Sequence, residues 1–79
     1  MIKVYSTPWC SSCSQLKRYF KDKKIDYTEV DLDKYPERSQ EVIDLCGMFT
    51  VPVTVVEKAG ELPRIVTGYN ISSLSACLN

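Results

Sequence analysis

Trp9-Cys10-Ser11-Ser12-Cys13 joins a short β-type run, Ile2-Lys3-Val4-Tyr5, to a helix-like stretch, residues 14–24, and this junction is the strongest indication of the fold. The C-x-x-C spacing places both sulfurs within one turn of a helix that starts where a strand ends. A helix N-terminus favours thiolate over thiol, so the position suits thiol–disulfide exchange. The motif alone is also compatible with a metal site or an inert disulfide, and the rest of the chain bears on that choice.

Size and composition narrow the possible functions. The chain has 79 residues, which suffice for one domain, residues 1–79, with a small core. Ten basic and ten acidic side chains give zero formal net charge, whereas nucleic-acid binders carry a basic footprint. No apolar run has the length of a secretory signal or the ~18 residues of a membrane helix. We therefore expect a cytoplasmic protein, in a compartment where a close cysteine pair is more often catalytic or metal-binding than structural.

The charges are unevenly distributed along the sequence. Basic residues gather in the first predicted helix, at Lys17, Arg18, Lys21, Lys23 and Lys24. Acidic residues dominate the stretch that follows, at Asp26, Glu29, Asp31, Asp33, Glu37, Glu41 and Asp44. The simplest interpretation is two solvated faces of opposite sign. The alternative is a basic patch near the cysteines that attracts an acidic partner.

Hydrophobic periodicity predicts strands and helices in the order β-α-β-α-β-β-α. Strands are expected at residues 2–6, 25–31, 51–57 and 64–67, and helices at 11–23, 37–46 and 71–78, with Gly47 as a helix stop and Asn70 as a cap. The buried stripes should comprise Cys13, Leu16, Tyr19 and Phe20 on the first helix, and Val42, Leu45 and Cys46 on the second. Because a helix joins the first two strands, these should be parallel.

The two cysteines of the motif should have different roles. Cys10, the exposed thiol at the helix N-terminus, would attack a substrate disulfide, and Cys13, one turn further in, would resolve the mixed disulfide. The chain has no histidine, which excludes a Cys–His nucleophile and any histidine-containing zinc site. Cys46 and Cys77 stand alone on apolar stripes, where a free cysteine behaves as a small hydrophobe. We therefore expect no metal site.

A second signal is Thr50-Val51-Pro52, at the start of the third predicted strand. A proline there lacks the N–H that a central strand would use. If the Val51–Pro52 bond is cis, Val51 presents its backbone outward, where an extended substrate segment could pair with it. From the residues alone, a trans bond is the better expectation, because few X-Pro bonds are cis.

The Cys10–Cys13 motif, Thr50-Val51-Pro52, Gly68 and the order of the elements together resemble the thioredoxin superfamily, specifically its small glutaredoxin-like branch. The resemblance implies an α/β thioredoxin-like fold, with a four-stranded mixed sheet, helices on both faces and a cis Val51–Pro52 bond. It also implies a monomeric dithiol–disulfide oxidoreductase that reduces protein disulfides and needs no bound cofactor. The substrate groove would be lined by Trp9, Thr50, Val51, Pro52, Gly68 and Tyr69, although Trp9 and Tyr69 could instead cover the edge of the core.

The same resemblance separates two possible electron donors. Ser11-Ser12 replaces the Gly-Pro or Pro-Tyr typical of thioredoxins and glutaredoxins. Glutaredoxins that use glutathione carry a lysine three residues before the nucleophile, where this chain has Thr7, and a Gly-Gly-x-Asp loop, where it has Thr67-Gly68-Tyr69-Asn70. These departures favour a flavoprotein of the thioredoxin reductase type, with glutathione as the alternative. A metal or iron–sulfur carrier, in which Cys10 binds a cluster shared by two chains, is an alternative from another class.

Overall fold

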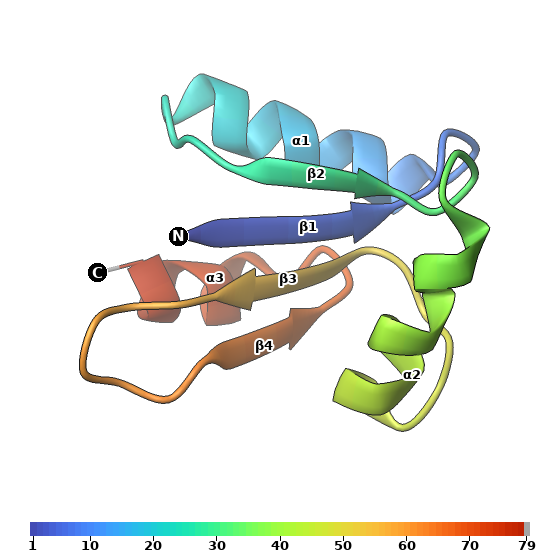
Figure 1. Ribbon diagram of the computed structural model, residues 1–79. Helices are drawn as coiled ribbons and strands as arrows, with labels where there is room; N and C mark the ends of the chain where they lie inside the picture. Colours follow the sequence, from blue (N-terminus) through green and yellow to red (C-terminus); the bar gives the residue numbers. More distant parts are fainter. Residues whose placement is uncertain (79) are drawn as a thin grey trace.

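The computed structural model describes residues 1–78, which form a mixed sheet with helices on both faces (Figure 1). The elements are β1 (Ile2–Ser6), α1 (Ser11–Asp22), β2 (Thr28–Asp31), the 3₁₀ turn η1 (Pro36–Arg38), α2 (Ser39–Cys46), β3 (Val53–Val56), β4 (Arg64–Thr67) and α3 (Ile71–Leu78). The strand order is β2-β1-β3-β4. β1 and β2 are parallel, whereas β3 is antiparallel to both of its neighbours. The predicted order of elements and the thioredoxin-like sheet are therefore confirmed.

Two hydrophobic clusters lie on opposite faces of the sheet. β1 contributes Val4 to one cluster and Tyr5 to the other, because successive strand side chains point to opposite faces. The cluster under α1 and α3 contains Val4, Leu16, Phe20, Val56, Val66, Leu74 and Cys77. The cluster under α2 contains Tyr5, Val30, Leu32, Val42, Val53 and Val55. We call these two sides the α1 face and the α2 face.

β2 is shorter than the alternating pattern predicts, since it begins at Thr28 rather than at residue 25. Lys24 adopts a positive φ of 57°, and the Ile25 N–H donates to the Phe20 carbonyl at 2.9 Å, so this segment still closes the end of α1. Ile25 and Tyr27 pack against the cluster of the α1 face without pairing to β1. The alternation thus indicated partial burial correctly but overestimated the strand.

The second helix also differs in detail from the prediction. Pro36 opens a 3₁₀ turn, and the α-helix starts only at Ser39. Val42 is buried and Cys46 is half-buried, whereas Leu45 is exposed, so its predicted inward position is wrong. With two turns of helix, the pair Val42 and Cys46, four residues apart, defines the inward stripe and leaves Leu45 beside it. Gly47 ends the helix with φ +79°, as predicted.

The loops that precede β3 and follow β4 meet at one end of the sheet. β3 starts at Val53, later than predicted, and the Pro52 carbonyl before it accepts the Gly68 N–H at 2.8 Å. β1 ends at this same end, and α1 begins there (Figure 1). The fold therefore gathers the cysteine motif, Thr50-Val51-Pro52 and the Gly68 loop. Within residues 1–78, no helix is long and apolar enough to cross a bilayer.

Candidate redox site

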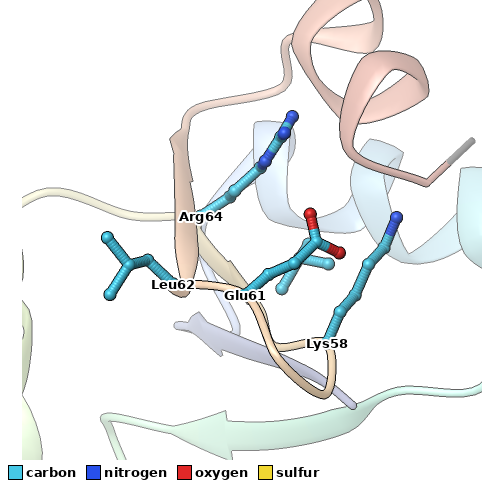
Figure 2. Close-up of a pocket in the computed structure, with 5 residues that line it drawn as sticks. Lys58, Glu61, Leu62 and Arg64 are labelled. Atoms are coloured by element: carbon cyan, nitrogen blue, oxygen red, sulfur yellow. The ribbon is translucent and has the colours of Figure 1, made fainter.

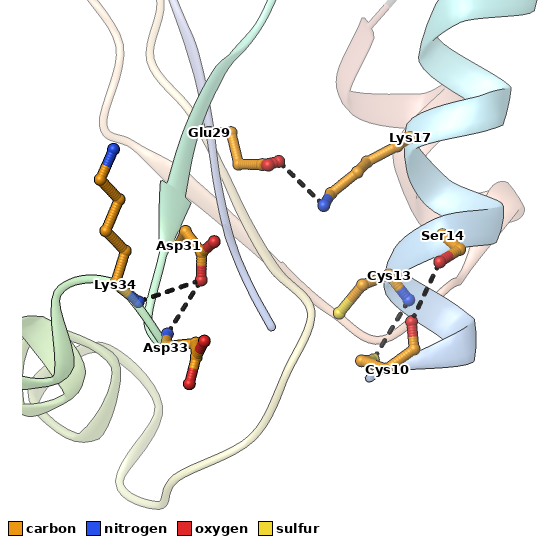
Figure 3. Close-up of polar contacts among 8 residues, drawn as sticks. All are labelled: Cys10, Cys13, Ser14, Lys17, Glu29, Asp31, Asp33 and Lys34. Atoms are coloured by element: carbon orange, nitrogen blue, oxygen red, sulfur yellow. Dashed lines mark hydrogen bonds and ion pairs between the residues drawn. The ribbon is translucent and has the colours of Figure 1, made fainter. Parts of the chain in front are cut away.

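Cys10 is the N-cap residue of α1, with extended backbone dihedrals. Its sulfur accepts the Cys13 backbone N–H at 3.2 Å and lies 3.8 Å from the Val51 carbonyl oxygen (Figure 3 shows the Cys13 contact). The N–H contact is available to a thiolate, whereas only a thiol can donate to the carbonyl. These two contacts leave Cys10 half-buried, where the sequence predicted an exposed thiol.

Cys13 is fully buried one turn further into α1. Burial, together with a hydrogen bond to Cys10, raises the pKa of Cys13 to about 12, against the lowering effects of the Thr7 backbone and the Lys17 ammonium. Cys13 is therefore protonated at neutral pH in the dithiol form. The two thiols are unequal in access, and burial keeps Cys13 protonated, which suits a division into an attacking and a resolving cysteine.

The Thr50-Val51-Pro52 segment lies against Cys10. The Val51–Pro52 bond is cis, which the frequency of such bonds disfavoured and the family resemblance implied. Val51 directs its carbonyl at the Cys10 sulfur, and the buried Pro52 is joined through its carbonyl to Gly68. Thr50 is half-buried in the same segment. The structure thus brings these predicted groove residues together with the cysteine.

Trp9 and Tyr69 lie at the surface of the segments that form the site. Trp9 is 73% exposed, and Tyr69 is exposed beside an open groove on α1 that Gln15, Arg18, Tyr19, Asp22 and Lys23 also line. Neither aromatic ring is buried in the core clusters. Both rings are therefore open to solvent at the surface.

Met48 and Phe49 are exposed apolar residues that sequence reasoning missed. Their side chains are 63% and 51% exposed, and they come directly before Thr50-Val51-Pro52. The available signal was two large apolar residues after a helix-ending glycine, where no regular element would bury them. Together with Trp9 they form what we call the apolar rim, carried by the two segments that hold Cys10 and Val51.

Lys17 is one of the five basic residues that the sequence gathers in the first helix, but it differs from the other four. Arg18, Lys21, Lys23 and Lys24 are exposed, whereas the Lys17 ammonium lies 2.8 Å from the Glu29 carboxylate on β2 (Figure 3). Burial lowers the pKa of Lys17, but the hydrogen bond and the charge of Glu29 outweigh burial, so that the pKa is raised. The basic patch is therefore solvated at four positions and paired at the fifth.

A pocket at the β3–β4 hairpin lies at the other end of the sheet. Figure 2 shows four of the residues that line it, Lys58, Glu61, Leu62 and Arg64, around the hairpin, and Val56 completes the lining. It contains no cysteine and is separated from Cys10 by the length of β3. Among residues 1–78, no group of three or more His, Cys, Asp or Glu side chains is gathered closely enough to hold a metal ion.

Comparisons with known proteins agree on one family. The glutaredoxin family model matches residues 2–60. An uncharacterised glutaredoxin-like 8.6 kDa protein in the rubredoxin operon of Clostridium pasteurianum is 34% identical over 70 residues, which are 89% of this chain and 87% of that protein. The glutaredoxin-like protein NrdH of Lactococcus lactis subsp. cremoris is 32% identical over 53 residues, which are 67% of this chain and 72% of that protein.

Solved structures show the same fold. The thioredoxin-like protein BC3987 has a TM-score of 0.79 at 26% identity, covering 98% of this chain and 99% of that one. The glutaredoxin from Archaeoglobus fulgidus has a TM-score of 0.83 at 22% identity, covering 99% of this chain and 85% of that one.

Proposed function

The chain belongs to the glutaredoxin family of thiol–disulfide oxidoreductases, and from this premise we propose that it reduces disulfide bonds of protein substrates through Cys10 and Cys13. One observation carries the proposal. The accessible sulfur of Cys10 receives the Cys13 backbone N–H at the start of α1, while the Cys13 thiol itself is buried beneath it. A reducing cytoplasm is the compartment that suits such a recycled dithiol.

In the first step, the Cys10 thiolate attacks one sulfur of the substrate disulfide. A bond forms between Cys10 and that sulfur, and the other substrate sulfur leaves as a thiolate and takes up a proton. The N–H of Cys13 stabilises the thiolate before attack, because it donates to the sulfur at 3.2 Å. The product is a mixed disulfide between Cys10 and the substrate.

In the second step, Cys13 loses its proton and attacks the Cys10 sulfur. The bond between Cys10 and the substrate breaks, the second substrate thiolate leaves and is protonated, and a Cys10–Cys13 disulfide remains. Two electrons have then passed from the dithiol to the substrate. Because Cys10 carries no charge in the mixed disulfide, one cause that raises the pKa of Cys13 is absent at the moment when Cys13 must ionise.

The surroundings of Cys10 support a protein as substrate. We assign Thr50, Val51, Pro52, Gly68, Trp9 and Tyr69 to the groove, with the backbone of Val51 pairing an extended segment. The apolar rim adds exposed Trp9, Met48 and Phe49 beside that groove. Exposed apolar side chains next to a reactive group are typical of protein–protein contact.

The electron donor in this proposal is a flavoprotein of the thioredoxin reductase type. Thr7 stands where glutathione-using glutaredoxins carry a lysine. Its side chain is uncharged and buried, so this position offers no positive charge to the groove. Asn70 stands where those proteins have an acid, and its side-chain oxygen accepts the Ser73 N–H at 3.1 Å as the cap of α3. Both positions lack the charges that would hold the ends of glutathione.

Variants of the two cysteines test the proposed roles. Cys10→Ser should abolish reduction of a protein disulfide, and Cys13→Ser should accumulate a mixed disulfide that mass spectrometry detects. Cys46→Ser is the matched control, since this half-buried cysteine lies on the α2 face, and it should retain activity. Full activity of Cys10→Ser would overturn the proposal.

Paired NADPH-coupled assays test the donor. We expect turnover with thioredoxin reductase and little with glutathione plus glutathione reductase. The opposite pattern would assign the protein to glutathione-dependent deglutathionylation, which needs only Cys10.

A further inference from the structure

The Lys17–Glu29 ion pair lies on the same side of α1 as the Cys13 thiol. Lys17 follows Cys13 by four residues, so both side chains leave one face of the helix. Glu29 is paired with Val4 in the parallel ladder, and Val4 belongs to the cluster of the α1 face, which places Glu29 toward α1. Figure 3 shows Cys13 and Lys17 both projecting from α1 toward the strands, with Glu29 reaching the ammonium.

The other groups around Cys13 carry less electrostatic weight. On α1, Cys10 is the titratable neighbour on the site side. Just before β2, Tyr27 lies close enough to act on Lys17, and on β2 the Asp31 carboxylate already accepts two backbone N–H groups, at 2.9 and 3.3 Å. Other polar groups on this face are the Ser6, Thr54 and Cys77 side chains. The Tyr19 hydroxyl on α1 also lies on this face, 3.5 Å from the Ser75 hydroxyl on α3, and the backbone of the buried Thr7 acts on Cys13.

We propose that the Lys17 ammonium is a positioning charge for the resolving step, and that Glu29 sets how much of that charge reaches Cys13. The proposal rests on the proposed function, since it acts in the second exchange step. There the Cys13 S–H gives its proton to solvent, the thiolate forms beside Lys17, and it displaces the substrate sulfur from Cys10. Lys17 forms no covalent bond and transfers no proton in this exchange.

The physical basis is the partial shielding of the pair from water. The two side chains are only 30% and 35% exposed, so their field is less screened than that of the solvated patch residues. A positive charge near a thiol favours the thiolate, and this is the direction in which Lys17 acts on Cys13. Glu29, at 2.8 Å from the ammonium, opposes that field. Removing the Lys17 charge should therefore make Cys13 harder to ionise, whereas removing the Glu29 charge should make it easier to ionise.

A stopped-flow reaction with Ellman's reagent separates the two steps. The first thionitrobenzoate leaves when Cys10 attacks the reagent, and the second leaves when Cys13 displaces it from Cys10. The protein carries Cys46→Ser and Cys77→Ala, so that only the Cys10–Cys13 pair reports. Below the pKa of Cys13, the rate of the second phase rises with the fraction of Cys13 thiolate, so the rates between about pH 5 and pH 9 compare how readily Cys13 ionises in each variant.

Lys17→Gln should shift the second phase to higher pH by about 0.5–1 unit and slow it about 3- to 10-fold at neutral pH. Glu29→Gln should shift it to lower pH by a similar amount and accelerate it. Lys17→Arg, which keeps the charge, should restore the wild-type profile. The first phase should change little in all three variants.

Shifts of the two glutamine variants in the same direction, or no shift in either, would overturn the proposal. A merely structural ion pair would give the first of these results, because both variants break it equally. The control is Arg38→Gln, which breaks an ion pair of 2.7 Å on the α2 face and should leave the profile unchanged. Failure of the proposed function gives a separate result: Cys13→Ser would then still release the second thionitrobenzoate, although it lacks the resolving thiol.

Discussion

The two faces of the sheet carry ion pairs of nearly equal length with different surroundings. On the α1 face, Lys17 and Glu29 join a helix to an edge strand at 2.8 Å, beside a buried cysteine. On the α2 face, Arg38 and Glu41 lie 2.7 Å apart within one turn of chain, and Glu41 also accepts the Tyr5 hydroxyl at 2.6 Å. Burial and the bond to Glu41 raise the pKa of Tyr5 to about 12, and the bonds to Arg38 and Tyr5 lower that of Glu41 to about 2.

What differs is the group that each pair acts on. The α2-face network fixes a tyrosine that ties α2 to β1, and thus contributes to stability. The α1-face pair acts on a thiol that must change its protonation state during turnover. An ion pair of given length is thus structural or functional according to the titratable group beside it. Variants on each face of the sheet test this difference.

The largest expected effect is on the core of the α1 face. Phe20 is fully buried and packs its ring 5.1 Å from that of Tyr27, so Phe20→Ala should cost about 3–5 kcal/mol of unfolding free energy. Val42→Ala on the α2 face removes two methyl groups and should cost about 1–3 kcal/mol. Urea denaturation followed by circular dichroism measures both. Equal losses would show that the two faces contribute alike and would contradict this ranking.

The next effect is the acid dependence of the α2-face network. Because the folded pKa of Glu41 lies below the usual value of 4.5, its stabilisation is present above pH 4.5 and is lost as pH falls toward about 2. The side chain is 40% exposed, so we expect about 1 kcal/mol rather than the full value of the shift. Glu41→Gln should be less stable than wild type by that amount at neutral pH and equally stable near pH 2. A difference that persists at pH 2 would have another origin than the charge.

Much of this arrangement follows from local sequence signals. The strand at residues 2–6, the stop at Gly47 and the Asn70 cap are all local features, and the structure has each where the sequence predicts it. The C-x-x-C spacing likewise predicted the separate environments of Cys10 and Cys13, because one turn of helix carries the second cysteine inward.

The features that escaped prediction depend on contacts between distant segments. Lys17 and Glu29 meet only because the β1–β2 register places Glu29 opposite Val4, and no local pattern encodes that register. Leu45 looked apolar enough for the core, but a helix of two turns buries a narrow stripe. The cis bond before Pro52 was expected from the family resemblance, not from the residues themselves.

The weakest effect is expected at the end of the α2 face, where α2 leads into the apolar rim. Phe49→Ser should raise the KM for a protein disulfide by about 3- to 10-fold, as loss of one exposed apolar contact would, and leave both phases with Ellman's reagent unchanged. Leu62→Ser is the matched control, because Leu62 is 88% exposed at the hairpin, the opposite end of the sheet.

Lys17→Gln should show the converse behaviour, with an altered second phase and an unchanged KM. If Phe49→Ser also altered the second phase, the rim would act on the cysteines themselves and not only on substrate binding. If instead Leu62→Ser raised KM as much as Phe49→Ser, the loss of any exposed apolar side chain would be sufficient, and the rim would have no special place beside Cys10.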